Sequence, residues 1–462
     1  MKNKLLLLLL ILFSVSFAEF RYNGNSYTIL SSDNHTDDTY FENWTKLDFS
    51  YNKFRAGFQV ESHNPPLSFS QDTVGYGLYQ RYLNYSSNNI QITIGNFYTM
   101  LGRGLVLRSF ENRPLRWDTN IDGVNFNFQT KYVDGKLLSG KPRDRSGMRL
   151  DRLDGGELTF KIHDRVQVGS TYLATIDDEE KRIHRGSGYL NFSFPLASFY
   201  SEYASRKDFE TDWGEGRALY TSADFFINTM TLRAEYKDYD NYHLYKNSLY
   251  DYNNPPTVVR EHLYTLLNRH QHIINPQDEK GWLVESLIPV SDYGMSTLSY
   301  SKTNNHQGDR LFQEYYAQLE LFYPEDWNWI LAAGHEKDRE GRYMNFVFGS
   351  TYNFNYINTI KIIYEHQHNK ILLTDRQFFS QIYYLEYSRA PHFTISIIAE
   401  RTTEQFSERD LWLGAQLDTQ FFDRYELSLF GGTRREGKIC SGGVCVYKPE
   451  FEGIEAIFQV RI

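Results

Sequence analysis

Long apolar runs are absent from the sequence after residue 18. A helix needs about 18 consecutive apolar residues to cross the hydrocarbon of a bilayer, so a membrane-spanning helix is excluded there. Cysteine is scarce: only 2 of the 462 residues are cysteine, so at most one disulfide can form within the chain. The Gly-x-Ser-x-Gly, His-Glu-x-x-His and phosphate-loop motifs are also absent. Their absence argues against an enzyme without excluding one, since a barrel hydrolase assembles its site from distant strands.

The first 18 residues have the order of a secretory signal peptide. Two lysines precede the apolar run 5–13, and a Ser-Phe-Ala sequence ends at Ala18. Cleavage after Ala18 would remove both lysines and change the net charge from −9 to −11. This acidic balance argues against a nucleic-acid partner. We therefore expect a mature chain of residues 19–462, forming a single domain, to work outside the cytoplasm.

The composition combines many aromatic residues with a hydrophilic average. Aromatic residues make up 16% of the chain and charged residues 23%, while the mean hydropathy is −0.56. A transmembrane β-barrel produces this balance, because alternate residues face lipid and a wet lumen, and tyrosine and tryptophan collect at both interfaces. A secreted β-sandwich or propeller is the alternative.

Alternation of apolar and polar residues separates these folds. In the last segment, GIEAIFQVRI, every second position from Ile454 to Ile462 is apolar. The same period recurs along the chain, and the connectors alternate between short and long, as in outer-membrane barrels. This predicts an all-β fold: an antiparallel transmembrane β-barrel of about 24 strands, within a range of about 20 to 24, with both termini in the periplasm. Among the connectors, SSDNHTDDTYFEN is expected to be long and KDREG of modest length.

The signal peptide, the alternating aromatic-bounded strands and the amphipathic last strand resemble outer-membrane β-barrel (porin-like) proteins of Gram-negative bacteria over the whole mature chain. The chain departs from that pattern at its end, because Ile462 stands where such proteins most often have an aromatic residue. The resemblance implies a location in the outer membrane, contact with its lipid and lipopolysaccharide, and recognition of the C-terminal strand by the barrel-assembly machinery. More narrowly, GRGLVLRSFE, YNNPPTVVREHLYTLLNRHQH and CSGGVC resemble segments of an uncharacterised barrel family.

The stretch GRGLVLRSFENRPLRW places four arginines among apolar residues. An arginine on the lipid face near the bilayer midplane costs roughly 2 to 4 kcal/mol, so these side chains must avoid lipid. By the connector count, residues 99–119 form a loop on the extracellular side, and we expect its apolar residues 105–107 to be buried as it folds into the barrel mouth. The predicted pore constriction and solute-binding site consists of Arg103, Arg108, Arg113, Arg116 and Trp117. The alternative is that the arginines pair with lumenal carboxylates and brace the wall.

A ring of arginines in a pore favours anions and polar solutes, and the planar guanidinium also stacks on sugars. We therefore predict an outer-membrane channel or selective transporter for small polar solutes, anionic or saccharide, with no cofactor and no metal. No separate plug domain precedes the first strands, which argues against a TonB-dependent receptor. The alternatives are a barrel hydrolase at the outer surface, and a scaffold or assembly protein that binds a surface partner through its long loops.

Two further loops carry predictions. The connector 239–281 is the longest, and its apolar residues favour an ordered extracellular loop that acts as a lid. His270 and His272 within it are a weak signal for a metal, and ordinary polar contacts are the preferred interpretation. Cys440 and Cys445 flank the sequence SGGV, and in an oxidising compartment this spacing favours a disulfide that stiffens the tip of an external loop.

Overall fold

The computed structural model describes residues 20–64, 75–113, 115, 117–144, 147–177, 181–208, 213–214, 216–242, 253–441 and 444–462. For residues 438–441 and 444–448 the description is confined to the backbone. The expected signal peptide, residues 1–18, lies outside these ranges.

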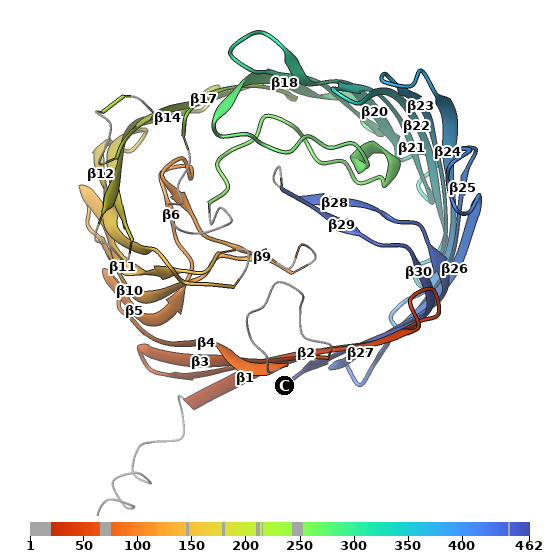
Figure 1. Ribbon diagram of the computed structural model, residues 1–462, viewed down its shortest axis with the longest axis horizontal. Coiled ribbons are helices and arrows are strands. Elements are labelled where there is room, and N and C mark those ends of the chain that lie inside the picture. Colours follow the sequence, from red (N-terminus) through yellow and green to blue (C-terminus); the bar gives the residue numbers. More distant parts are fainter. Residues whose placement is uncertain are drawn as a thin grey trace, which may run out of the picture.

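Twenty-four strands form one antiparallel sheet that closes on itself (Figure 1). Each wall strand pairs with the next wall strand along the chain, and the first also pairs with the last, from Asn25 opposite Arg461 to Asp33 opposite Gly453. The predicted all-β barrel and its strand number are confirmed.

The first twelve wall strands are β1 (Phe20–Asp33), β2 (Asp38–Tyr51), β3 (Phe54–Asn64), β4 (Tyr76–Ser86), β5 (Ile90–Phe97), β10 (Ile121–Gln129), β11 (Val133–Pro142), β12 (Arg152–His163), β13 (Val166–Ile176), β14 (Arg182–Phe194), β15 (Ala197–Lys207) and β16 (Gly216–Ile227). The other twelve are β17 (Met230–Asp240), β18 (Asp278–Ser291), β19 (Gly294–Asn304), β20 (Arg310–Leu321), β21 (Trp327–Asp338), β22 (Gly341–Asn355), β23 (Asn358–Ile371), β24 (Gln377–Arg389), β25 (Phe393–Thr402), β26 (Leu411–Phe421), β27 (Tyr425–Arg434) and β30 (Phe451–Arg461). Short elements inside the barrel are β6 (Met100–Leu101), β7 (Leu107–Arg108), β8 (Glu111–Asn112), β9 (Trp117–Asp118), the 3₁₀ turn η1 (Leu266–Asn268), β28 (Gly437–Ser441) and β29 (Val444–Lys448).

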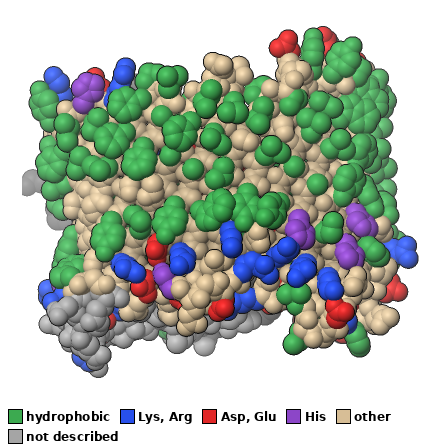
Figure 2. All heavy atoms as spheres, turned by 90° about the horizontal axis from the view of Figure 1, so that it is seen from above, with side chains coloured by type: hydrophobic (Ala, Val, Ile, Leu, Met, Phe, Trp, Pro, Cys, Tyr) green, Lys and Arg blue, Asp and Glu red, His purple; other side chains and the backbone are tan. Residues whose placement is uncertain are grey.

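Side chains alternate between the two faces of the wall. On β11, Leu137 is 55% exposed on the outside, whereas its neighbour Leu138 is buried on the inside. Large apolar side chains are exposed around the outer surface and form a belt in Figure 2. An exposed apolar surface of this extent requires contact with lipid, because water would disfavour it. In the ranges the structure describes, no helix has the length and apolar character needed to span a bilayer.

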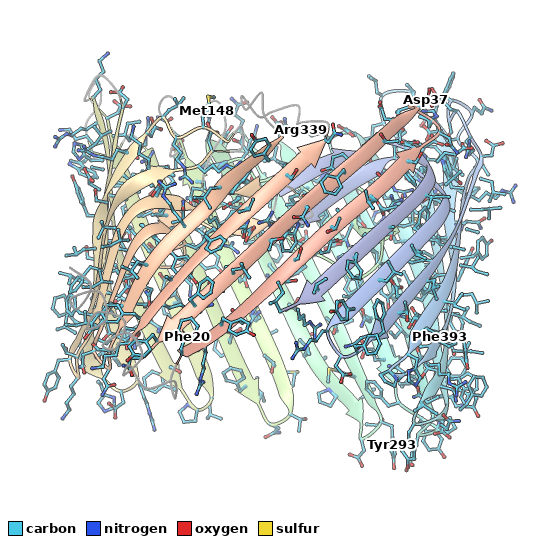
Figure 3. The ribbon with its side chains drawn as sticks, turned by 90° about the horizontal axis from the view of Figure 1, so that it is seen from below. Phe20, Asp37, Met148, Tyr293, Arg339 and Phe393 are labelled. Atoms are coloured by element: carbon cyan, nitrogen blue, oxygen red, sulfur yellow. The ribbon has the colours of Figure 1, made fainter. Side chains whose placement is uncertain are left out.

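The connectors define two different rims (Figure 3). Phe20, Tyr293 and Phe393 lie at the short-turn rim, whereas Met148 and Arg339 lie at the opposite, long-connector rim. Because the strand number is even, β30 ends beside the start of β1 at the short-turn rim. The location of this rim in the periplasm stays a prediction.

Several connectors at the long-connector rim are shorter than predicted, and two of them show the reason. Strands β1 and β2 continue through SSDNHTDDTYFEN until Asp33 pairs with Asp38, and Asp37 takes a left-handed φ of 56° in the tight turn between them. In the turn after β21, the carboxylate of Asp338 accepts a hydrogen bond from the N–H group of Gly341 at 2.6 Å. In both places polar residues stabilise a tight turn, either by a local hydrogen bond or by adopting a left-handed φ. The paired strands therefore continue through polar residues whose composition had predicted a loop.

Candidate functional site

Among the described residues, three segments lie inside the barrel (Figure 1). The first inner loop, residues 98–120, joins β5 to β10 and contains β6 to β9. The second inner loop, residues 253–277, is part of the connector between β17 and β18 and contains η1. The third segment is the hairpin of β28 and β29, and β28 contacts η1. All three enter from the long-connector rim, because they join strand ends at that rim.

A hydrophobic core inside the barrel seats the first inner loop. Leu101, Leu105, Val106 and Leu107 are fully buried, as predicted for residues 105–107. Their apolar partners on the inner wall are Leu138, Leu153, Leu173, Ala204, Ala218 and Tyr239. Burying four such side chains contributes on the order of 6 to 12 kcal/mol. The first inner loop is therefore held firmly against the inner wall of the barrel.

The tip of this loop makes a tight turn over a buried carboxylate. Gly102, between β6 and β7, takes a left-handed φ of 56°, and a Cβ atom there would lie 2.5 Å from Oε1 of Glu202. Glu202 is fully buried and accepts hydrogen bonds from the N–H group of Arg103 at 2.9 Å and from the hydroxyls of Ser187 and Tyr200 at 2.7 Å each. Glycine is required here, because any side chain would displace the carboxylate.

Asn253 connects the two inner loops. Its side-chain oxygen accepts a hydrogen bond from the N–H group of Arg108 at 2.5 Å. Its side-chain nitrogen donates to the carbonyl oxygens of Gly104 and Leu105 at 3.3 and 3.4 Å. Asn253 is buried, so water competes poorly for these groups. The two inner loops are therefore held together as one unit.

One of the predicted constriction residues, Arg113, braces the wall. Its guanidinium lies 2.9 Å from the carboxylate of Glu61 on β3, contacts the carboxylate of Glu111, and stacks over the ring of Trp44 at 4.6 Å. Burial lowers the pKa of Arg113, but Glu61 and Glu111 more than offset this effect, so its pKa is raised overall. The charge of Arg113 is therefore neutralised by the wall and by its own loop.

Arg103 and Arg108 contact aromatic rings and, unlike Arg113, form no ion pair with a described residue. Arg103 is exposed, and its guanidinium lies over the ring of Tyr200 at 4.8 Å. Arg108 is half-buried, with its guanidinium 5.6 Å from the centre of the Phe110 ring. Within the described part of the chain, neither guanidinium has a carboxylate oxygen within 4.0 Å. Both guanidinium groups therefore differ from that of Arg113, which is paired with two carboxylates.

Trp117 packs within the first inner loop. Its side chain is buried, and its ring meets Phe110 edge-on at 4.9 Å beside Leu115. Trp117 therefore stabilises the loop from inside and presents little surface to the lumen. Arg116, the remaining predicted constriction residue, lies outside the described residues.

The second inner loop is bound to an acidic wall. Arg260 lies 2.7 Å from Glu235 and 3.3 Å from Glu285, and Arg269 lies 2.7 Å from Glu400. Burial lowers the pKa of Arg260, but Glu235 and Glu285 more than offset it and raise the pKa overall. These pairs neutralise wall carboxylates that would otherwise repel an anion in the lumen.

Hydrogen bonds and apolar contacts complete this attachment. The N–H group of Leu266 donates to the carboxylate of Glu365 at 2.8 Å, and the side-chain nitrogen of Gln367 donates to the carbonyl oxygen of Leu266 at 2.8 Å. Tyr264 and Leu267 pack with Val347 on the inner wall. The described part of the predicted lid therefore lies along the inner wall of the barrel.

Lys237 on β17 and Glu279 on β18 form a completely buried ion pair. The ammonium nitrogen of Lys237 lies 2.6 Å from a carboxylate oxygen of Glu279, and neither side chain is exposed. Glu279 also accepts a hydrogen bond from the N–H group of Asn275 at 2.7 Å and lies 2.8 Å from Nε2 of His272. Because a buried charge needs a partner, this cluster fixes the end of the second inner loop to the wall.

The two histidines of the second inner loop do not converge on one point. The ring of His270 stacks on Tyr343 with centroids 3.5 Å apart, whereas His272 contacts Glu279. Across the described ranges, no group of three or more His, Cys, Asp or Glu side chains is placed to hold a metal ion.

The hairpin of β28 and β29 carries both cysteines and crosses the lumen in Figure 1. The sequence had suggested a position at the tip of an external loop. The hairpin instead lies inside the barrel. Its register places Cys440 directly opposite Cys445. Opposite residues of an antiparallel pair have Cα atoms about 4.5 to 5.5 Å apart, which suits a disulfide. The cysteine side chains lie outside the described part, so the disulfide stays a prediction.

A cavity of about 530 Å³ opens inside the barrel near the short-turn rim. Its lining comes from β24 to β27, β30 and β1, and includes Tyr27, Asp418, Glu426 and Gln459. No described residue of the two inner loops lines it. Among the described residues, this cavity is therefore separate from the two inner loops.

The comparison with protein families assigns the chain to one of them. A family model described as "Family of unknown function (DUF6029)" matches residues 1–287 and 286–462. The chain belongs to this family. Among curated proteins, none matches the chain in sequence. Membership of DUF6029 agrees with the resemblance of the sequence to an uncharacterised barrel family.

Solved structures resemble this DUF6029 chain at low sequence identity. The P pilus usher (PapC) translocation pore is 9% identical, with a TM-score of 0.49, covering 96% of this chain and 99% of that one. OccK5 (OpdH) of Pseudomonas aeruginosa is 11% identical, with a TM-score of 0.40, covering 83% and 98%. A BenF-like porin of Pseudomonas fluorescens Pf-5 is 8% identical, with a TM-score of 0.38, covering 96% and 98%. Likenesses of this size transfer no function to this chain.

Proposed function

We propose that this chain is an outer-membrane channel for small polar solutes, chiefly anionic ones, and that its own inner loops narrow the passage. A contrast among the lumenal arginines carries this proposal. Arg113, Arg260 and Arg269 each have a carboxylate oxygen within 3 Å. Arg103 and Arg108 have none within 4.0 Å among the described residues. An arginine that only braces a wall needs such a partner, so these two have another role.

The surroundings of Arg103 and Arg108 suit a carboxylate, a phosphate or a sugar ring. A guanidinium offers several N–H donors in one plane, and these match the oxygens of a carboxylate or phosphate. The rings of Tyr200 and Phe110 lie against the two guanidinium groups and limit their orientations. Three wall carboxylates beside the second inner loop, those of Glu235, Glu285 and Glu400, are paired with Arg260 and Arg269. A solute anion therefore meets net attraction at the narrow part of the lumen.

The barrel size explains why several segments are needed to narrow it. Barrels of 16 to 18 strands already enclose an aqueous channel, and the diameter grows with the strand number. A barrel of 24 strands would admit large molecules if its lumen were empty. The inner loops reduce this opening, and the contacts of Asn253 keep them in one arrangement. No observation on the described residues favours the hydrolase or the scaffold over the channel.

We expect the double variant R103Q/R108Q to lose anion selectivity. One unit charge at about 4 Å contributes about 1 kcal/mol even in bulk water, which corresponds to roughly fivefold in the permeability ratio for each arginine. The reversal potential of single channels in a planar bilayer under a salt gradient measures this ratio. The matched control is R81Q/R217Q, because both arginines lie on the outer face and pair with Asp122 and Asp240 at 3.4 Å.

The control variant should keep the selectivity and the unitary current of the wild type. Equal selectivity in all three proteins would show that Arg103 and Arg108 do not determine the anion selectivity of the channel. The absence of current from folded wild-type protein would contradict the channel itself.

A further inference from the structure

A line of basic side chains crosses the outside of the barrel near the long-connector rim. The registers between β19 and β24 align one residue of each strand in a single cross-strand row. This basic row consists of Lys302, Gln313, Lys337, Arg342, Lys370 and Gln377. Figure 2 shows lysine and arginine side chains, with histidines among them, directly beside the apolar belt. Four of the six positions in the row are therefore basic.

The alternation of the wall places the row on the outer face. Glu336, next to Lys337, and Tyr343, next to Arg342, are buried on the lumenal side. The next outward-facing row, closer to the belt, has two tyrosines and one phenylalanine among its six members, which are Tyr300, Tyr315, His335, Met344, His368 and Phe379. Aromatic side chains collect where lipid meets water, so the basic row marks the polar edge of the bilayer.

Three of the four charges of the basic row lack protein counter-charges among the described residues. Within the described ranges, Lys302, Lys337 and Arg342 have no carboxylate oxygen within 4.0 Å, while Lys370 lies 2.7 Å from Asp375. Lys337, Arg342 and Lys370 are direct cross-strand neighbours, and like charges at such positions destabilise a sheet. An arrangement that disfavours the isolated barrel indicates an anionic partner outside the chain.

Three outward arginines elsewhere on the barrel show the opposite arrangement. Arg81, Arg152 and Arg217 lie 3.4, 3.0 and 3.4 Å from acidic side chains of the barrel itself. Their partners are Asp122, Asp154 and Asp240. At these three sites the barrel itself supplies the counter-charge that Lys302, Lys337 and Arg342 lack among the described residues.

We propose that the basic row binds the phosphate groups of an anionic lipid in the leaflet at the long-connector rim. Adjacent strands lie about 4.8 Å apart, so Lys337 to Lys370 spans about 10 Å, and the four basic residues from Lys302 to Lys370 span about 19 Å. This spacing suits a headgroup that carries more than one phosphate, with its acyl chains along the apolar belt. Each basic residue near the surface strengthens binding of anionic lipid about fivefold. The row thereby orients the barrel in its membrane, whether or not the lumen conducts.

The test compares the wild type with K337Q/R342Q/K370Q, both as full-length protein in a neutral detergent. The wild-type unfolding temperature, followed by tryptophan fluorescence, should rise on titration with micelles that contain a bisphosphorylated glycolipid. The triple variant should need about a hundredfold more of this lipid for the same rise. Without lipid it should be at least as stable as the wild type, because the like-charge repulsion is gone. The control R81Q/R152Q/R217Q should keep the wild-type response to lipid.

Three results would overturn the proposal. One is an equal response to the glycolipid in the wild type and the triple variant. Another is an equal rise with phosphatidylcholine micelles, and the third is an equal rise with inorganic phosphate alone. Should the triple variant fail to fold, the single variant R342Q replaces it, with an expected loss of about fivefold in lipid affinity.

Discussion

Replacing Gly102 by valine should displace the tip of the first inner loop and raise the single-channel conductance on the order of twofold. A Cβ atom at this position would lie 2.5 Å from Oε1 of the buried Glu202. The φ of 56° adds about 1 to 2 kcal/mol of strain for a residue other than glycine, and more for a β-branched one. The turn relieves both effects by moving away from the wall. Recording in planar bilayers measures the conductance, and the unfolding temperature should fall in parallel.

Gly308→Ala separates backbone strain from the collision with Glu202. Gly308 has a φ of 97°, and an added Cβ atom would meet nothing within 4 Å. We expect this control to keep the wild-type conductance, because the added Cβ atom displaces no neighbouring group. An unchanged conductance in Gly102→Val, or an equal increase in Gly308→Ala, would show that the tip of the loop does not limit the passage.

Lys237→Met should lower the free energy of unfolding by about 3 to 5 kcal/mol. The substitution leaves the fully buried carboxylate of Glu279 without its ammonium partner at 2.6 Å. His272 and the N–H group of Asn275 remain as partners, so the lower end of this range is expected. Urea-dependent unfolding of the protein in lipid vesicles measures the free energy.

The double variant K237M/E279Q should recover most of this loss, because it removes both charges and keeps a hydrogen-bond acceptor for the second inner loop. Lys280→Met is the matched control, since Lys280 is the neighbour of Glu279 on the outer face. Equal losses in Lys237→Met and Lys280→Met would show that the buried pair contributes no more than an outward lysine.

The wall of the barrel could be predicted from the sequence because its strands and turns are specified by residues that are close together along the chain. A period of two residues marks each strand, and a change between short and long connectors marks the two rims. Both signals need only neighbouring residues, and they gave the correct strand number. Two of the wrong connector lengths, at Asp33 to Asp38 and after Asp338, arose where polar residues stabilise a tight turn.

The contents of the lumen could be predicted only in part, because their contacts are distant in sequence. The backbone N–H group of Arg103 donates to Glu202, which lies 99 positions away in sequence. The backbone N–H group of Arg108 donates to Asn253, which lies 145 positions away. Spacing along the chain carries no information about such pairs. The sequence therefore identified the arginines but could not separate the paired Arg113 from Arg103 and Arg108.

One local signal for the inner loops was available and was missed. Leu137 and Leu138 are consecutive in β11, so both faces of the wall are apolar at that point. Leu137 faces lipid, while Leu138 belongs to the core that seats the first inner loop. Consecutive apolar residues in a barrel strand indicate that another segment packs inside. The basic row gives no such signal, since only the strand registers align its members.

The most direct test of the proposed channel is the swelling of liposomes that contain the wild-type protein. Isosmotic solutions of a small carboxylate, a neutral sugar and an organic cation of similar size would be compared by light scattering. The exposed Arg103 and the half-buried Arg108 predict the fastest entry for the carboxylate and the slowest for the cation. Swelling no faster than that of empty liposomes, or fastest entry of the cation, would contradict it.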